Sequence, residues 1–448
     1  MKKIRIGCGA GYAGDRIEPA IELVKGGKLD YIVFECLAER TIAIAQQDKA
    51  KNPDKGYNHL LEDRMRAILP IAKEMGVKII SNMGAANPIS AINKTAEIAR
   101  ELGLSGLRLA AVTGDGITEG IGEFYDNEVL ELGCKLAELS DKIVSANAYT
   151  GAEGILAALE GSADIILTGR VSDPSLVIAP LIHEFGWSNE PDKIGQAVLA
   201  GHLLECAGQV TGGYYADPGF KEVPNLAALG FPLIEMGEDG SFIITKVEGS
   251  GGMVTTQTCK EQLLYEIHDP QSYLTPDAIA DFSKVRFTEL EPDVVQATGA
   301  TSFKKPDNLK VSIGYKDCFI GEGEIHYGGR NALARAKLAG EVVAKRLEII
   351  NAEVEELRID YIGSNSLYMD KISNTLKHHG SPEIRLRISG RTKDAKNAAK
   401  IANEVEALYT NGPAGGGGAT KAVFEIISIC SIFIPREAVK TIVTYTEV

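Results

Sequence analysis

One pair of side chains has the types and the spacing that proton transfer requires. His202 and Glu205 are three positions apart in a stretch with helical periodicity, so both project from one face of a helix. A histidine beside a carboxylate can transfer protons near neutral pH or bind a divalent metal. The alternative interpretation is a structural histidine whose ring is satisfied within the apolar core.

A second pair joins a guanidinium to a carboxylate. Arg170 and Asp173 lie in the segment TGRVSDPS, directly after a short apolar run. The guanidinium fork suits a carboxylate or phosphate ligand because it donates two parallel hydrogen bonds. Alternatively, Arg170 and Asp173 pair with each other, and Asp173 caps the next helix with Pro174 at its first position. Both interpretations can hold together.

A glycine loop near the N-terminus carries the third motif. Gly9–Gly14 reads GAGYAG, it lies between an apolar run and a helical stretch, and Glu35 stands at the end of the next apolar run. This is the context of a dinucleotide-binding fingerprint. Asp15 and Arg16 come next, where a carboxylate would crowd a pyrophosphate. The alternatives are a turn that lets another ligand approach the backbone, or tight packing of helix on sheet.

The elements that must position these residues recur six times as strand, loop and helix. The apolar runs are short and bounded by turn residues, which is typical of strands buried on both faces. Amphipathic stretches between them are predicted crossover helices. We predict an α/β fold with a mainly parallel sheet and helices on both faces, and a barrel is the alternative. The predicted strands are Ile4–Gly7, Tyr31–Phe34, Val77–Ile80, Leu107–Val112, Ile143–Ala146 and Ile165–Leu167.

Polar and glycine residues gather where these strands end. Because the carboxyl ends of parallel strands share one edge of a sheet, we expect these residues to converge on one cleft. As turn formers and caps, the aspartates have a purely structural alternative. The candidates for catalysis or metal binding are Glu35, Asp173, His202 and Glu205. The candidates for substrate binding are Gly9, Gly11, Gly14, Asp15, Arg16, Arg40, Asn82, Asp115, Asn147 and Arg170.

The pattern changes after the sixth strand, which predicts three segments. Residues 1–210 form the parallel α/β domain, and residues 211–305 form a β-rich extension packed on it, with a hairpin over 232–247. Residues 306–448 are expected to form a smaller α+β domain in the order ββαββα, of the ferredoxin-like kind. Its glycine-rich loop, 412–418, precedes Lys421 and could cradle an anion, or it could be a flap or interface loop.

Composition limits the classes of partner. The 448 residues carry a formal net charge of −14 and no basic run, which argues against nucleic acid and anionic membranes. The N-terminus lacks the apolar core of a signal peptide. Seven scattered cysteines without a C-x-x-C pair indicate reduced thiols, so we expect a cytoplasmic protein. We also expect a homo-oligomer that acts on a small molecule.

Six segments together resemble a known family. They are Arg5–Arg16, Asp30–Thr41, Ser81–Pro88, Thr168–Trp187, Gly201–Gly219 and Gln262–Pro270. They are similar to the acyclic terpene utilisation proteins of the AtuA type, over about residues 3 to 350. That resemblance implies a place in the catabolism of citronellol-type terpenes through acyl-CoA intermediates. Longer relatives continue into an extra ferredoxin-like domain, which for this chain would come from a separate small subunit.

The leading hypothesis is a catabolic enzyme that acts on a small carboxylic acid or acyl-CoA thioester by acid–base chemistry. A hydratase, lyase or isomerase needs a base beside a carbon acid and fixed positive charge for the anion. A divalent metal or a CoA ester is the cofactor that such chemistry would use. The alternatives are a nicotinamide- or flavin-dependent oxidoreductase using Gly9–Gly14, and a non-catalytic subunit of a catabolic complex.

Overall fold

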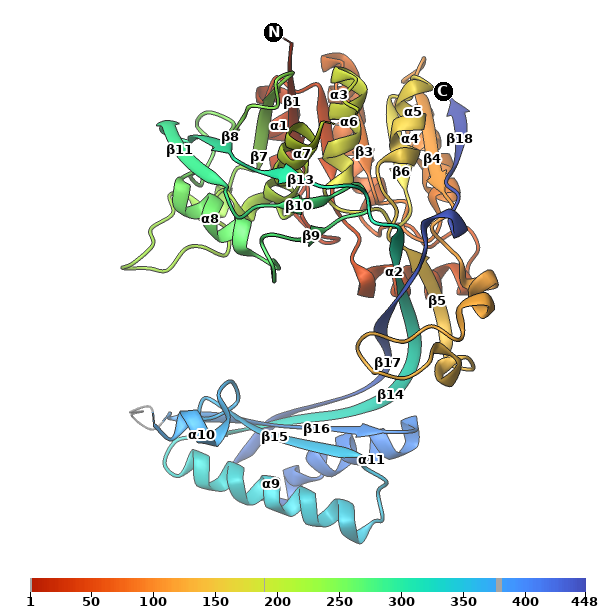
Figure 1. Ribbon diagram of the computed structural model, residues 1–448. Helices are drawn as coiled ribbons and strands as arrows, with labels where there is room; N and C mark the ends of the chain where they lie inside the picture. Colours follow the sequence, from red (N-terminus) through yellow and green to blue (C-terminus); the bar gives the residue numbers. More distant parts are fainter. Residues whose placement is uncertain (1, 189, 376–380) are drawn as a thin grey trace. The chain divides into compact units, whose positions relative to one another are not determined.

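The chain folds into two compact units in the computed structural model, which describes residues 2–188, 190–375 and 381–448 (Figure 1). Unit 1 comprises Met1–Gly314 and Ile429–Val448, and unit 2 comprises Tyr315–Ser428. Strands β14 (Asn308–Gly328) and β17 (Gly416–Pro435) are hydrogen-bonded neighbours, and each belongs partly to both units. Unit 2 is therefore an insertion in the chain of unit 1.

Unit 1 contains a ten-stranded sheet with a parallel centre. The parallel strands lie in the order β1 (Lys3–Cys8), β2 (Tyr31–Phe34), β3 (Lys78–Ser81), β6 (Ile165–Thr168) and β4 (Arg108–Thr113). Antiparallel strands extend it on both sides: β7 (Pro232–Gly237), β8 (Phe242–Lys246), β12 (Val294–Thr298) and β11 (Arg286–Glu291) beyond β1, and β18 (Ile442–Glu447) beyond β4. The sheet is thus mixed rather than mainly parallel, and no closed barrel occurs in the described part of the chain.

The predicted fifth strand does not join this sheet. β5 (Ile143–Ala148) pairs with β14 instead, and the edge position beside β4 belongs to β18. β5 is excluded from this edge because β18, which is distant from β4 in the sequence, pairs along the whole of β4. Residues 211–305 likewise add strands to the same sheet, because the predicted hairpin β7–β8 pairs with β1.

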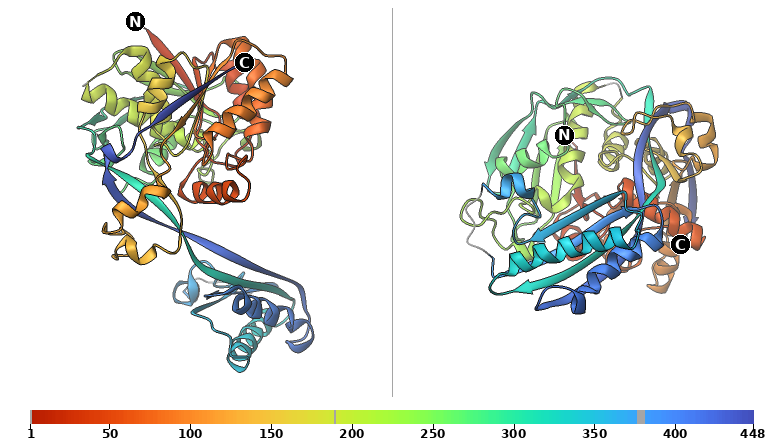
Figure 2. Two further views of the ribbon diagram at one scale, coloured as in Figure 1. Left: turned by 90° about the vertical axis from the view of Figure 1, so that its right-hand side faces the viewer. Right: turned by 90° about the horizontal axis from the view of Figure 1, so that it is seen from below.

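Helices cover both faces of this sheet (Figure 2). One set packs together as α1 (Glu18–Gly26), α3 (Leu61–Met75) and α4 (Pro88–Glu101). The other set packs together as α5 (Glu153–Glu160), α6 (Ser175–Phe185) and α7 (Pro191–Glu205). Crossovers from β1 to β2, β3 and β4 run one way along the sheet, and the return to β6 runs the other way. Because such crossovers are right-handed, the reversal places the later helices on the opposite face.

The remaining described elements of unit 1 are two helices, five 3₁₀ turns and a small sheet. They are α2 (Glu39–Lys51), α8 (Thr256–Leu264), the 3₁₀ turns η1 (Thr118–Phe124), η2 (Leu136–Leu139), η3 (Ala207–Gln209), η4 (Leu226–Ala228) and η5 (Arg436–Ala438), and a small sheet of β9 (Tyr273–Leu274), β10 (Ile279–Asp281) and β13 (Thr301–Ser302). No helix in the described residues is long and apolar enough to cross a membrane.

Unit 2 has its own sheet in the order β15, β16, β14, β17 and a separate apolar core. Its further elements are α9 (Ala332–Ile349), β15 (Glu356–Ile362), α10 (Met369–Ser373), β16 (Glu383–Thr392), α11 (Ala395–Glu406) and α12 (Leu408–Asn411). The element order of β14, α9, β15, β16, α11 and β17 is β-α-β-β-α-β, not the expected ββαββα. The first two strands expected in this segment form one long strand, β14. The polar residues between them, Lys316 and Asp317, make ion pairs within the sheet and do not form a turn.

The expected third segment is therefore divided. Residues 306–314 and 429–448 belong to unit 1, and only Tyr315–Ser428 forms unit 2. The separation has a physical basis in the packing, since the large apolar cluster of unit 1 and the cluster of unit 2 share no residue. The glycine-rich loop 412–418 leads into β17, where Gly415 and Gly418 adopt positive φ angles of 74° and 66°.

Candidate functional site

A cavity of about 350 Å³, which we call the site cavity, lies where the central parallel strands of unit 1 end. The loops after β1, β2 and β6 form one wall, and the end of α7 with the segment around Tyr265–Tyr273 forms the other. The volume is that of a small-molecule site. Its lining residues are Gly11, Tyr12, Ala13, Glu35, Cys36, Leu37, Ala38, Glu39, Thr41, Tyr149, Arg170, Asp173, Glu205, Cys206, Tyr265, Glu266 and Tyr273.

Glu35 follows β2 and is half-buried in this cavity. Its Oε1 accepts hydrogen bonds from the Leu37 amide at 2.9 Å and from Asn82 Nδ2 at 3.0 Å. Burial and the nearby charge of Asp173 raise the pKa of Glu35 to about 8, against the smaller lowering by these bonds and by Arg170. Because Oε1 is occupied as an acceptor, the proton of the neutral acid belongs on Oε2.

Arg170 and Asp173 follow β6 and bind each other. Arg170 Nη1 is 3.0 Å from Asp173 Oδ1 and also donates to the carbonyls of Leu37 and Val171. The other Asp173 oxygen accepts the Tyr149 hydroxyl at 3.1 Å, and the guanidinium stacks on the Tyr149 ring. Burial raises the pKa of Asp173, although Arg170 offsets part of that effect. The predicted pairing of Arg170 with Asp173 is therefore present.

The other edge of the Arg170 guanidinium has few partners. Nη2 lies 3.6 Å from Glu39 Oε1, beyond hydrogen-bond distance, and Nε has no hydrogen-bond partner among the described residues. Burial opposes ionisation of Glu39, but Arg170 and Lys310 together lower its pKa. A ligand oxygen in the cavity would therefore meet a positive charge whose Nη2 is not saturated.

Glu205 is the cavity-facing member of the predicted pair with His202. The two side chains are hydrogen-bonded, with His202 Nδ1 2.8 Å from Glu205 Oε1. His202 Nε2 lies 3.2 Å from the Leu263 carbonyl oxygen, which can only accept, so Nε2 carries a hydrogen. Burial raises the pKa of Glu205 and opposes charge on His202, but Glu205 raises the pKa of His202 overall. His202 is fully buried and does not line the cavity.

Glu205 Oε2 is the unpartnered atom of this pair. It is buried and has no hydrogen-bond partner among the described residues, while Glu205 lines the cavity. A buried carboxylate oxygen without a donor is costly unless a ligand supplies one. The cavity thus presents one bare acceptor, Glu205 Oε2, and one acid proton, on Glu35 Oε2.

Three predicted site residues lie behind the cavity and hold its walls. Asn82 orients Glu35 and also accepts the Cys36 amide at 2.7 Å. Asp115 accepts the backbone amide of Arg170 at 2.9 Å and Asn147 Nδ2 at 2.8 Å, so Asp115 and Asn147 support the loop after β6. Although β5 leaves the sheet, Asn147 still reaches this cluster through its bridge to Gly116. None of the three lines the cavity.

The glycine loop packs against the protein itself. A Cβ on Gly9 would lie 2.5 Å from the Phe34 ring, and one on Gly11 would lie 2.4 Å from the Cys206 backbone. The Gly11 amide donates to Asp15 Oδ2 at 2.9 Å, which occupies an amide that a phosphate would need. The sheet also continues from β1 through β2 to β3 without the reversal beside β1 that dinucleotide folds use. This geometry favours tight packing over a dinucleotide site.

The two remaining predicted arginines do not enter the site cavity. Arg16 lines a neighbouring cavity together with Asp15, and its Nη1 donates to the Ala227 carbonyl at 3.0 Å. Arg40 is exposed at the start of α2. In unit 2, Lys421 of the expected anion cradle is paired with Glu406.

Tyr149 and Arg64 are among the residues that shape the site and that the sequence analysis did not mark. Tyr149 lines the cavity between Arg170 and Asp173, and no pattern marked it. Arg64 is fully buried and donates to the carbonyls of Ala13 and Asp15, which holds the glycine loop on α3. A signal existed for Arg64, because it occupies the apolar stripe of its helix between Leu61 and Ile68.

The charges of the cavity limit its chemistry. Among the described residues, five carboxyl side chains and one guanidinium line it. In the same part of the chain, no cluster of three or more His, Cys, Asp or Glu side chains has a geometry suited to a metal ion. What the arrangement can do directly is donate a proton from Glu35 and accept one at Glu205.

Comparison with known proteins identifies the family. Residues 4–445 match the family described as acyclic terpene utilisation family protein AtuA, which is nearly the whole chain. No curated protein matches the sequence. The match includes every segment that forms the cavity. The chain belongs to the acyclic terpene utilisation family AtuA.

Proposed function

We propose that unit 1 is a proton-transfer enzyme of the hydratase, lyase or isomerase type, acting on an acyl thioester or small carboxylic acid. Its family description supports a role in acyclic terpene utilisation. The observation that carries the proposal is the presence in one cavity of a carboxyl group that keeps its proton and of a carboxyl oxygen without a hydrogen-bond donor among the described residues. Glu35 has a pKa of about 8 and is a neutral acid at pH 7, whereas Glu205 Oε2 has no donor among the described residues.

In the proposed reaction Glu205 Oε2 removes a proton from the carbon beside the substrate carbonyl. The electron pair of that C–H bond forms the C–C double bond of an enolate, and the carbonyl π pair moves to the oxygen, whose charge Arg170 stabilises through Nη2. Glu35 Oε2 then gives its proton to the leaving hydroxyl in a dehydration, or to another carbon in an isomerisation. Two carboxyl groups with separated proton affinities are the usual basis for such a division of roles.

The surplus of carboxyl groups favours a substrate with a neutral reacting end. A thioester carbonyl carries no charge, whereas a free carboxylate would meet Glu39, Asp173 and Glu205 with only Arg170 to offset them among the described lining residues. We therefore favour the thioester over the free acid. The oxidoreductase alternative has no comparable support, because the Gly11 amide is already bonded to Asp15.

We also propose that unit 2 is a ferredoxin-like module. The β-α-β-β-α-β element order and the strand order β15, β16, β14, β17 support this assignment. A homo-oligomeric assembly and a cytoplasmic location remain predictions from the sequence.

The test uses neutral N-acetylcysteamine thioesters, both saturated and 2-unsaturated, in heavy water. Wild-type protein is expected to exchange the C2 hydrogen of the saturated thioesters for deuterium or to add water across the double bond of the 2-unsaturated ones. Both reactions are measured by NMR. Glu205→Gln should slow both reactions, and Glu35→Gln should slow the hydration, by about 10²-fold or more, the scale of losing a general acid or base. Glu74→Gln, an exposed glutamate on α3, is the matched control and should retain the wild-type rate.

Two results would contradict the proposal. Absence of both exchange and hydration across the thioester series would remove the reaction class. A folded Glu35→Gln protein with the wild-type hydration rate would show that Glu35 is not the acid.

A further inference from the structure

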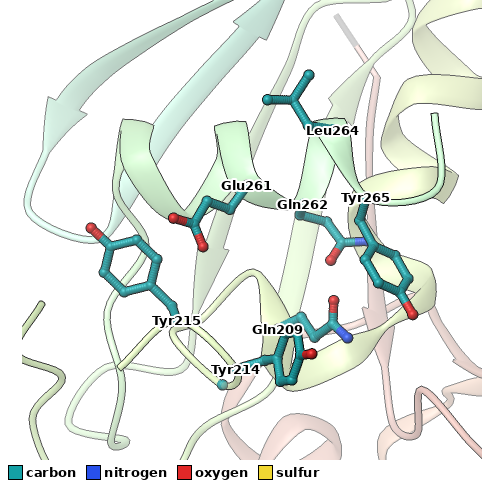
Figure 3. Close-up of a pocket in the computed structure, with 8 residues that line it drawn as sticks. Gln209, Tyr214, Tyr215, Glu261, Gln262, Leu264 and Tyr265 are labelled. Atoms are coloured by element: carbon teal, nitrogen blue, oxygen red, sulfur yellow. The ribbon is translucent and has the colours of Figure 1, made fainter. Parts of the chain in front are cut away.

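Two further hollows adjoin the site cavity. A cavity of about 540 Å³ shares Gly11, Tyr12, Cys206 and Tyr265 with it. A third, of about 240 Å³, shares Gln209, Gly213, Tyr214 and Tyr265 with the second. Figure 3 shows this third hollow, where Gln262 and Tyr265 at the end of α8 face Gln209 and Tyr214. Tyr265 borders all three, so they lie side by side.

The part beyond the site cavity has an apolar wall. We call it the tail groove, and its apolar and aromatic lining includes Tyr12, Tyr214, Leu226, Leu229, Phe231 and Tyr265. Leu229 and Phe231 are buried at its floor. Tyr214, Tyr12 and Leu226 are 92, 61 and 43% exposed at its rim. Such a cluster of exposed large side chains beside a site is typical of a surface that a ligand covers.

The floor of the tail groove is built by close backbone packing. A Cβ on Gly208 would lie 2.8 Å from Leu229, and one on Gly213 would lie 2.7 Å from the Gly208 carbonyl oxygen. Gly212 has a φ of 109°, which residues with a side chain rarely adopt. The turn after α7 is therefore pressed onto Leu229 and Phe231, which keeps the floor of the groove apolar and well defined.

The charges in the tail groove argue against a polyphosphate ligand. Asp15 and Arg16 are adjacent and of opposite sign, and the only other charged residue that lines the groove in the described part of the chain, Glu261, is paired with Lys221. A nucleotide arm with several phosphates would need several free cations. An aliphatic chain needs none and gains free energy from each methylene group that leaves water.

We propose that the tail groove binds the aliphatic chain of the acyl substrate, with the carbonyl end in the site cavity. The position of the carbonyl rests on the proposed function, while binding of the chain does not require catalysis. The thioester arm then leaves the cavity by another route than the tail groove. Tyr265 borders both the site cavity and the tail groove, so in this arrangement it contacts the substrate where the carbonyl end meets the aliphatic chain.

The test is calorimetric titration with saturated N-acetylcysteamine thioesters of straight-chain acids from C4 to C12. Proton exchange on these compounds produces no net reaction, so Kd is measured at equilibrium. We expect Kd to fall by about fourfold for each added methylene until the groove is filled. Leu226→Glu places a carboxylate at the rim and should weaken C10 and C12 binding about tenfold or more, with C4 binding within about twofold.

Leu290→Glu on β11 is the matched control, since Leu290 is 52% exposed and lies outside all three hollows; its binding should equal wild type. A flat series in wild type would overturn the proposal. So would equal losses of C4 and C12 binding in Leu226→Glu, because the substitution would then not act on the aliphatic chain. A normal chain-length series without turnover would overturn only the proposed function, and turnover with a flat series would overturn only the tail groove.

Discussion

Two neighbours of Glu35 bind the same carboxyl oxygen and thereby determine which oxygen holds its proton. The Leu37 amide and Asn82 both donate to Oε1, which leaves Oε2 to hold the hydrogen and to face the cavity. These bonds stabilise the charged form, and burial with the Asp173 charge outweighs them. The proton state of this residue is therefore a property of the assembled site rather than of its residue type.

The raised pKa of Glu35 predicts a pH dependence for both rate and stability. As the general acid of a dehydration, Glu35 acts only when protonated, so the dehydration rate should fall about tenfold per pH unit above pH 8. The folded state retains this proton between the ordinary pKa of 4.5 and about 8. Its stabilising contribution is complete below pH 4.5 and is lost as pH rises through 8.

Melting temperatures measured from pH 4 to 9 test the predicted pH dependence of stability. The wild-type value should decline toward pH 9 more steeply than that of Glu35→Gln, whose amide does not ionise. Parallel curves for the two proteins would show that Glu35 does not titrate in this range.

His202 and Glu205 should separate stability from catalysis. His202→Asn removes a fully buried ring that is bonded to Glu205 and Leu263, so the unfolding free energy should fall by about 1–3 kcal/mol. Glu205→Gln should lower the rate per folded molecule more than His202→Asn does, because of the two only Glu205 lines the cavity. Denaturant unfolding and deuterium exchange on both variants measure this, and the reverse ranking would make His202 the reacting group.

Even a conservative substitution of Arg170 is expected to impair the protein. Its Nη1 donates to Leu37, Val171 and Asp173 from a buried position, which a lysine cannot reproduce. Arg170→Lys should lower the unfolding free energy by about 2 kcal/mol or more and weaken substrate binding about tenfold. Lys310→Arg, which keeps a charge near Glu39, is the control. Wild-type stability with impaired binding would make Arg170 a ligand residue alone.

At the scale of elements, the site depends on how the loop after β1 meets the end of α7. Gly11 touches the Cys206 backbone, Asp15 binds the Gly11 amide, and Arg64 of α3 holds the carbonyls of Ala13 and Asp15. One wall of the cavity is thus fixed by three elements that are distant in the chain. A change in this contact should alter the whole wall.

Gly11→Ala tests that contact directly. Its Cβ would lie 2.4 Å from the Cys206 carbonyl carbon, so the loop must move, and we expect a loss of about 1–3 kcal/mol in unfolding free energy. In the matched variant Gly14→Ala, the new Cβ would lie 3.2 Å from the movable Tyr12 ring, and the loss should be small. Circular dichroism melts measure both, and equal losses would contradict the close packing at Gly11.

At the scale of the molecule, the main apolar core of unit 1 and the apolar core of unit 2 share no residue in the described part of the chain. The core of unit 1 draws on residues before 301 and on β18, whereas the core of unit 2 lies between Ile325 and Ala419. Because cooperativity follows shared packing, separate cores predict separate unfolding. Calorimetry should resolve two transitions, and thioester binding should raise only that of unit 1. A single transition that shifts as a whole would contradict this.

The sequence alone determined which segments form the strands in the part of the chain before Val210, but not all of the helices between them. Short apolar runs with turn residues on each side identified β1 to β6, because a strand buried on both faces needs a continuous apolar run. The spacing of His202 and Glu205 on one helix face is equally local, and their hydrogen bond follows from it. Glu35, Arg170 and Asp173 could be placed at one edge because parallel strands share their carboxyl ends.

Only the tertiary structure decided what depends on contacts between distant residues. β18, from the far end of the chain, takes the edge beside β4, so β5 lies outside the sheet and the C-terminus belongs to unit 1. The same holds within the site. Whether Glu205 or His202 faces the cavity depends on the packing of α7, and whether Glu35 keeps its proton depends on Asn82, Asp173 and burial. Such properties arise from the summed surroundings of a group, which no local pattern in the chain records.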